Sequence, residues 1–511
     1  MKKKLILLIL LLLTISVGVT YAIFKWTSTN SDITFNIEGC YVTYNGGSNI
    51  SGASFGPALS KNDTNNVISK KISMTPECAG VTANLTLKVD SIDDGLKEQS
   101  FIYELYDGTS KIANGNFADA TTGKIYNLLN TKTLTKDTTQ KYTLYIYIDG
   151  NQDNPTTMGG QSFSFTLGAS GENALYKEPP VNAVTLVEGL DEGATGDSGS
   201  GVYKVQHDAT PSSNSATGAE IPAVTDYRYY GASPNNYICL DMEGGSTCPD
   251  KHLYRIIGSI YEEKENTNRI KVIKATPLTD GTTNGFSWDY KSDGTYDNIW
   301  ATITSGNYSN SLTSGSELMK LLNSGAWWNG TSGSYYNGST TATTVNFTNY
   351  KLSDKAKSYI STSRYYLGGY SASSGVMTNQ FYTYERGTTR YDTNRPLYWD
   401  GMVGLMYPSD YGYAAGNTCV TRTDPYNYDG GCKNKDWLWM TTSSDYTNGY
   451  EWLISPNSGH SNYAFIVNSS GYVDYYNYVN PVHSVRPVFY LTSSASISEG
   501  EGSSTNPYIL S

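Results

Sequence analysis

Apolar and polar residues alternate with a period of two along most of this chain, which is the pattern of half-buried β-strands. Between residues 31 and 171 the alternation recurs in short runs bounded by turn residues, including 83–90, 101–106 and 141–148. Six or more such runs predict a β-sandwich over residues 31–171.

The second half of the chain also carries strand-like runs, but here helix signals interrupt them. Residues 314–317 resemble a capping box ahead of an apolar run, and Ser353 is a good N-cap for a second helix over 353–360. Runs at 462–467 and 471–475, separated by turn residues, predict antiparallel strands. The order of strands, two short helices and more strands predicts a mostly β, α+β domain over residues 226–511.

Residues 172–225 differ from both flanking regions, because they are rich in Gly, Ser, Thr and acidic residues and contain Pro179 and Pro180. This composition predicts an extended linker between the two domains. One strand-like run, 202–206, interrupts the segment and could already belong to the following domain.

The N-terminus has the three parts of a secretory signal: Lys2 to Lys4, an apolar run over 5–19, and small residues before Ala22. Apolar residues continue to Phe24, so residues 1–24 could be a cleaved signal peptide or an uncleaved signal-anchor. Both alternatives place the rest of the chain outside the cell, as an extracellular or cell-surface protein.

Composition supports a recognition surface and argues against binding to nucleic acid or to an anionic membrane. The formal charge is −11, and 45 Tyr stand against 12 Phe. Tyrosine combines apolar area with a hydroxyl group at low rotamer cost, which suits recognition; a nucleotide-composition bias is the alternative explanation. A membrane contact is expected only through the N-terminal segment, if it is uncleaved.

Six cysteines follow the signal, an even number in an oxidising compartment. Pairing by neighbourhood predicts three disulfides, with the alternative that some cysteines stay free: Cys40–Cys78, Cys239–Cys248 and Cys419–Cys432. A metal site is disfavoured because the cysteine spacings are not CxxC and the four histidines are scattered.

Arg486 lies in the apolar strand-like run 485–491 and therefore needs a charged partner. Glu451 or Asp436 is expected to supply it, in an ion pair that stabilises the fold.

The order of Trp300, the two helix signals, 403–410, 436–438 and 485–488 resembles the bacterial domain family DUF6273 over about residues 226–492. That resemblance implies the formylglycine-generating-enzyme branch of the C-type lectin fold, in Gram-positive surface proteins. The end of the signal and the sandwich are weakly similar to camelysin-type matrix modules.

Formylglycine-generating chemistry would need a reactive cysteine pair, whereas Cys419 and Cys432 flank a polar loop and have a structural role available. Lectin relatives often bind calcium, which directs attention to Asp289, Asp293 and Asp297. Turn formation is the preferred interpretation of these acids, and no cofactor is expected, although calcium stays possible.

The resemblance and the tyrosine content together suggest a ligand surface on the last strands. Its candidate residues are Trp452, Tyr463, Tyr472, Tyr475, Tyr476, Asn477 and Tyr478. We expect a non-catalytic protein that binds an extracellular protein or glycan. The alternatives are a matrix or fibre subunit assembling through the sandwich and, less favoured, an enzyme of the formylglycine-generating type.

Overall fold

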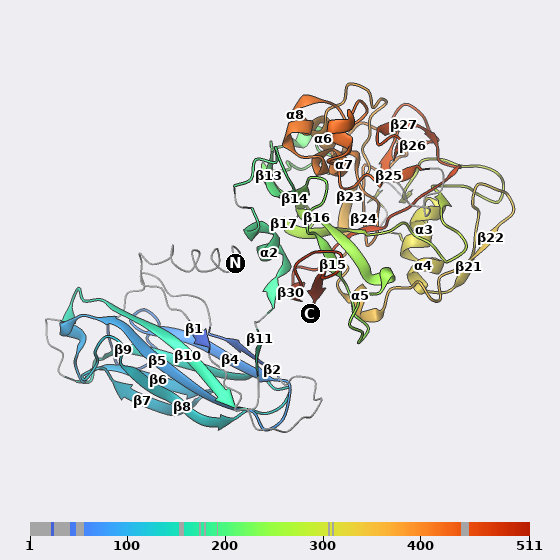
Figure 1. The fold of residues 1–511 in the computed structure, drawn as a ribbon. Helices are drawn as coiled ribbons and strands as arrows, with labels where there is room; N and C mark the ends of the chain where they lie inside the picture. Colours follow the sequence, from blue (N-terminus) through green and yellow to red (C-terminus); the bar gives the residue numbers. More distant parts are fainter. Residues whose placement is uncertain are drawn as a thin grey trace. The chain divides into compact units, whose positions relative to one another are not determined.

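The protein was analysed as a computed structural model, which describes residues 22–24, 41–46, 56–152, 158–172, 175–177, 180–191, 193–304, 307–308, 311–440 and 449–511. The chain divides into two compact units, Met1–Pro179 and Pro180–Ser511 (Figure 1). Mostly β structure with few short helices is the predicted fold class, and it is confirmed.

The N-terminal unit consists of two sheets around a common core. The smaller sheet has the order β1 (Ala22–Phe24), β10 (Phe163–Glu172), β5 (Thr82–Ile92) and β8 (Ile125–Thr133). The larger has the order β11 (Leu175–Lys177), β2 (Tyr41–Asn45), β4 (Ile68–Pro76), β9 (Gln140–Asp149), β6 (Phe101–Asp107) and β7 (Ser110–Asn116), with β3 (Pro57–Ala58) beside β9.

Alternation explains this core directly. In β5, Leu85, Leu87 and Val89 are fully buried while their neighbours face outward, as a strand with one covered face requires. A further alternating run in the sequence, residues 33–37, also predicts a strand but lies outside the described residues.

The C-terminal unit is built on a nine-stranded sheet. Its path is β12 (Val181–Asn182), β30 (Ser496–Glu499), β31 (Tyr508–Leu510), β15 (Tyr237–Cys239), β16 (Leu253–Glu262), β14 (Val224–Tyr230) and β13 (Gly201–His207), and β17 (Thr267–Lys274) joins β16 to β29 (Val488–Tyr490). The first strand of the unit therefore pairs with strands from the end of the chain: Val181 lies opposite Ile497, and Asn182 opposite Ser496.

Smaller sheets surround this one. They are β18 (Phe286–Ser287) with β28 (Val482–His483), β19 (Ile303–Thr304) with β20 (Asn307–Tyr308), β21 (Ser332–Tyr335) with β22 (Thr343–Asn346), β23 (Ser363–Tyr366) with β24 (Tyr398–Gly401), and β25 (Glu451–Pro456), β26 (Tyr463–Val467) and β27 (Val473–Tyr478).

Both predicted helices are present. The side chain of Ser316 caps α3 (Glu317–Asn323), and that of Ser353 caps α5 (Asp354–Ser358), each accepting a backbone N–H at 3.1 Å. Further short helices that the sequence analysis missed are α2 (Ala183–Gly189), α4 (Ala326–Asn329), α6 (Thr378–Glu385), α7 (Pro408–Ala414), α8 (Asn417–Arg422) and α9 (Gly430–Lys433). One or two turns give too few positions for a helical period to stand out.

The predicted linker over 172–225 is wrong for most of its length. Its beginning forms the end of β10 and β11 in the first unit, while β12, α2 and β13 belong to the second. Val187 of α2 is fully buried in the second core. Glycine-rich composition was misleading because Gly196 and Gly199 occupy positive-φ turns between folded elements rather than a flexible connector.

Two of the three predicted disulfides are confirmed, Cys239–Cys248 and Cys419–Cys432. Cys40 lies outside the described residues, so its pairing with Cys78 stays a prediction. Across the described ranges, no helix has the length and apolar character needed to cross a bilayer.

Candidate ligand-binding pocket

The tyrosine surface expected on β25 to β27 is not a continuous exposed face. Trp452 and Tyr463 are buried, and the Trp452 indole N–H donates to the Phe286 carbonyl at 2.8 Å. Every described position of β26 is buried, so this strand is covered on both sides, whereas alternation had predicted one free side.

The remaining members of that surface differ in exposure. Tyr472, Tyr475 and Asn477 are half-buried, and Asn477 hydrogen-bonds through its Oδ1 to His483 at 3.0 Å. Tyr478 is 45% exposed, and the side chain of Tyr476 lies outside the described residues. The exposed part of the predicted surface thus reduces to the edge strand.

Arg486 forms the expected ion pair. Its Nε and Nη2 donate to the two carboxylate oxygens of Glu451 at 2.6 and 2.8 Å, and both side chains are buried. In this bidentate geometry each buried charge is neutralised by the other, which identifies the pair as structural.

The aspartates considered for calcium are engaged with the protein. Asp289 accepts the backbone N–H groups of Asp297 and Glu317, Asp293 accepts from Thr295, and Asp297 forms an ion pair with Lys291 at 2.9 Å. In the ranges that the structure covers, no group of three potential metal ligands occurs. Turn and loop closure accounts for these contacts.

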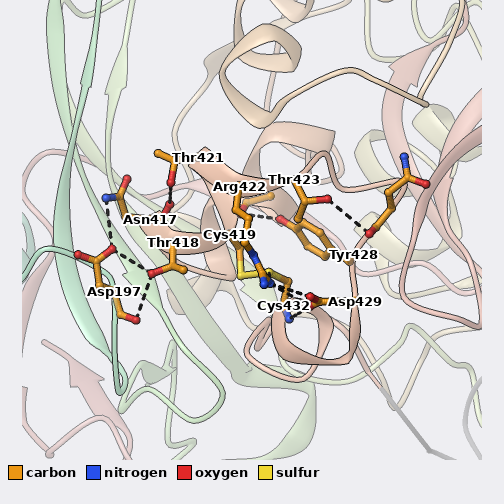
Figure 2. The surroundings of a disulfide bond; sticks show 12 residues. Asp197, Asn417, Thr418, Cys419, Thr421, Arg422, Thr423, Tyr428, Asp429 and Cys432 are labelled. Atoms are coloured by element: carbon orange, nitrogen blue, oxygen red, sulfur yellow. Dashed lines mark hydrogen bonds and ion pairs between the residues drawn. A yellow bond between two sulfur atoms is a disulfide. The ribbon is translucent and has the colours of Figure 1, made fainter.

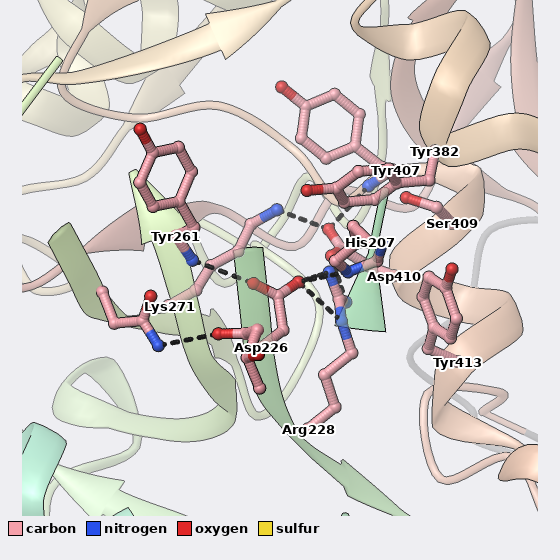
Figure 3. Close-up of polar contacts among 12 residues, drawn as sticks. His207, Asp226, Arg228, Tyr261, Lys271, Tyr382, Tyr407, Ser409, Asp410 and Tyr413 are labelled. Atoms are coloured by element: carbon pink, nitrogen blue, oxygen red, sulfur yellow. Dashed lines mark hydrogen bonds and ion pairs between the residues drawn. The ribbon is translucent and has the colours of Figure 1, made fainter. Parts of the chain in front are cut away.

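A buried ionic cluster that the sequence analysis missed lies between β14, β17 and α7 (Figure 3). Arg228 donates to Asp226 at 2.7 Å and to Asp410 at 3.0 Å, and Lys271 donates to the other oxygen of Asp410 at 2.5 Å. His207 lies 2.9 Å from the Asp226 carboxylate.

Each charge in this cluster has a partner of opposite sign inside the protein. Despite complete burial, the cations beside Asp226 and Asp410 hold the pKa values of both carboxyls below their usual range. A set of charges that is already compensated and closed to solvent has a structural role. It could not be found in the sequence, because Arg228 and Asp410 are 182 residues apart.

A pocket of about 420 Å³ opens elsewhere on the C-terminal unit. Its walls come from β15, β16 and the segment that follows α9. The lining residues are Ala232, Tyr237, Arg255, Ala275, Lys433, Asn434, Asp436, Trp437, Trp439, Met440 and Arg486. This volume lies in the range of small-molecule sites, and aromatic rings with a few polar groups are the usual lining of such sites.

Arg255 is the central polar group of this pocket. Its Nε donates to the Asn236 Oδ1 at 2.8 Å, and Nη1 lies 3.4 Å from the Trp437 carbonyl. The guanidinium carbon lies 4.6 Å from the centre of the Tyr237 ring and 4.3 Å from that of Trp437. Ring contacts on this scale attract a cation and hold its plane in a fixed orientation.

No carboxylate pairs with Arg255 among the residues of known placement. Burial lowers the pKa of Arg255 to about 10, and the neighbouring Arg486 acts in the same direction while Tyr237 opposes it. The group stays charged at neutral pH but is partly desolvated, and no anion among the described residues compensates it.

A disulfide fixes the second wall of the pocket. Cys432 of α9 is bonded to Cys419 of α8, and the Asp429 side chain caps α9 by accepting the Cys432 N–H at 2.9 Å (Figure 2). Lys433 follows directly. Its ammonium lies 5.4 Å from the Trp439 ring centre and 5.5 Å from that of Tyr472.

Asp436 completes the lining with an unpaired oxygen. Its Oδ1 accepts the Leu438 N–H at 2.9 Å, while its buried Oδ2 has no hydrogen-bond partner among the residues that the structure describes. Burial raises the pKa of Asp436 well above its usual range, with Glu451 adding to the shift, although backbone N–H groups and Arg486 oppose it.

Two other pockets lack this character. One of about 410 Å³ is lined by Tyr203, Lys204 and Tyr413, but Lys204 is paired with Asp191 at 3.2 Å. The other, of about 190 Å³, contains Lys274. The Arg255 pocket therefore combines the volume, the aromatic walls and the uncompensated charge expected of a ligand site.

Comparison with family models, with curated proteins and with solved structures found no match to this chain. The resemblance to DUF6273 and to C-type lectins stays a prediction.

Proposed function

We propose that this is an exported cell-surface protein that recognises an extracellular ligand through the Arg255 pocket of its C-terminal unit, without turning it over. One observation carries the proposal: a half-buried guanidinium, held by neutral acceptors and two aromatic rings, lines a pocket of ligand size and has no carboxylate partner among the described residues. A partly buried cation without an anionic partner destabilises the free protein, and an anionic ligand that pairs with it would remove this cost in free energy.

The compartment is supported by the two disulfides in the described chain, which are typical of proteins that fold in an oxidising environment. The N-terminal signal pattern adds to this support.

The formylglycine-generating alternative requires reactive thiols. Cys419 and Cys432 are joined to each other, and Arg422 donates to the Cys432 sulfur at 2.8 Å. Titration of the native protein with a thiol reagent separates the two functions: binding predicts no reactive cysteine, and a modified pair with oxidase activity would favour the enzyme.

An array of glycans and host extracellular proteins, probed with the full exported chain, tests the proposed function. Binding should depend on the pocket, so Trp439→Ala should abolish the signals that the parent chain gives. Lys355→Met, which removes an exposed charge outside the pocket, should preserve them. Signals that survive Trp439→Ala unchanged would contradict the proposal.

A further inference from the structure

The chemistry of the Arg255 pocket restricts which ligands it can bind. The inference about the ligand rests on the proposed function of the pocket. Two cationic groups with donor hydrogens line the same space, the Arg255 guanidinium and the Lys433 ammonium. Neither has a carboxylate partner among the described residues. An occupant rich in acceptor oxygens and carrying negative charge complements such a lining.

The compensated charges beside the pocket sharpen this conclusion. Arg486 already has Glu451, so it contributes little further attraction and separates Glu451 from the cavity. Within the described part of the chain, Arg255 and Lys433 are thus two cations without an anionic partner, in a protein whose formal charge is −11. A local positive field in an acidic protein favours an anionic ligand at that site.

The aromatic walls of the pocket indicate that its ligand contains a ring in addition to a negative charge. Tyr237 and Trp439 are half-buried, so parts of both rings line open space beside the two cations. The C–H face of a pyranose packs against such a surface while its hydroxyl and carboxylate oxygens accept hydrogen bonds at the rim. A volume of about 420 Å³ accommodates one such ring.

We propose that the pocket binds a pyranose that carries a carboxylate, such as a hexuronic acid residue of an extracellular polysaccharide. Its carboxylate pairs with Arg255, and the sugar ring lies against the aromatic walls with Lys433 beside it. A free small carboxylate and an acidic peptide share the charge but lack the ring, which allows the sources to be separated.

Calorimetric titration of the full chain with four probes tests this assignment: methyl glucuronide, methyl glucoside, acetate and a hexaglutamate peptide. Methyl glucuronide should bind at least about tenfold more tightly than methyl glucoside, because one charge-assisted hydrogen-bonded pair contributes about that factor in affinity. Binding of acetate should not be detectable. Binding of methyl glucuronide should weaken as salt is raised.

Variants locate the effect. Arg255→Met should weaken methyl glucuronide binding about tenfold or more, Arg255→Lys less, and Lys433→Met about threefold, while Lys355→Met leaves it unchanged. Circular dichroism and the thermal midpoint of each variant confirm that the fold persists.

The outcomes distinguish this inference from the function beneath it. Equal affinity for the glucoside and the glucuronide, or tighter binding of hexaglutamate, overturns the acidic-sugar assignment while the pocket still binds. Failure of every probe, together with an array ligand that still requires Trp439, overturns the assignment and leaves the proposed function standing. If no probe binds and the array also shows no bound ligand, both the acidic-sugar assignment and the proposed function are overturned.

Discussion

Arg228 and Arg255 lie on neighbouring strands of one sheet, β14 and β16, and both contact aromatic rings, yet their surroundings are opposite. Arg228 is 1% exposed and shares two carboxylates, whereas Arg255 is half-buried and has neutral acceptors only. A buried charge whose partners lie inside the protein serves the fold. One whose partner is missing is available to something outside it.

Arg228→Met tests the compensated side of this comparison and should have the largest effect. Asp226 and Asp410 would lose their shared partner in a fully buried site, so unfolding of the C-terminal unit should become easier by about 3–5 kcal/mol. Urea unfolding followed by tryptophan fluorescence reports on this unit, because eight of the nine tryptophans lie in it. A loss below about 1 kcal/mol would show that the cluster is dispensable.

Removing the Cys419–Cys432 disulfide by a double change to Ser tests what positions Lys433. Release of this short loop should cost about 3 kcal/mol and weaken binding of the pocket's ligand. The matched control is the Cys239–Cys248 pair, which closes a loop of similar length. Removal of the Cys239–Cys248 disulfide should lower the free energy of unfolding by a similar amount and leave the contribution of Lys433 to ligand binding intact. If both double variants lose the same binding affinity, the Cys419–Cys432 disulfide does not specifically position Lys433.

Lys274 is an intermediate case, because its ammonium is buried and donates to two neutral acceptors, the Asp250 carbonyl and the Thr276 hydroxyl. Burial lowers its pKa to about 8. The unfolded chain therefore binds this proton more tightly, so the contribution of Lys274 to stability should rise by roughly 2–3 kcal/mol between pH 8 and 10.5.

Comparing the parent chain with Lys274→Met across that pH range isolates this effect, since tyrosine ionisation is common to both. The variant should be the more stable near pH 7, and its advantage should shrink as pH rises. A difference that stays constant with pH would show that Lys274 is not the titrating group.

Arg255→Met should lower the free energy of unfolding least of these variants, in contrast to the large loss expected for Arg228→Met. The lost contact with the buried Asn236 costs about 1 kcal/mol, and removal of an uncompensated cation offsets part of it. The same urea titration measures this. A loss as large as that of Arg228→Met would make Arg255 a structural residue and remove the basis for the pocket as a ligand site.

Local signals in the sequence predicted much of the architecture. Strand alternation, the capping-box pattern at 314–317, the N-cap Ser353 and cysteine neighbourhood all act over a few residues, and each led to a correct element or bond, although the cap of α3 is Ser316 rather than the first residue of that pattern. The Arg486–Glu451 pair was within reach because one charge in an apolar strand demands another.

The pocket could not be predicted in this way. Arg255 lies in an ordinary strand pattern, and Trp437, which contacts it, is 182 residues further along the chain. The tyrosine surface failed for a related reason: whether a strand has one covered side or two depends on which elements pack over it, and alternation does not report that. Only tertiary structure reveals which charge lacks a partner.

The pairing of β12 with β30 has a mechanical consequence whenever the chain is pulled from its N-terminal side. Tension transmitted along the chain into Val181 acts first on the two residue pairs of β12, while the pocket is held by β15, β16 and the cross-linked α9 further along the load path. Two pairs at the end of a sheet peel away one at a time under such a pull. We therefore expect the short strand to separate under load before the walls around Arg255 are distorted.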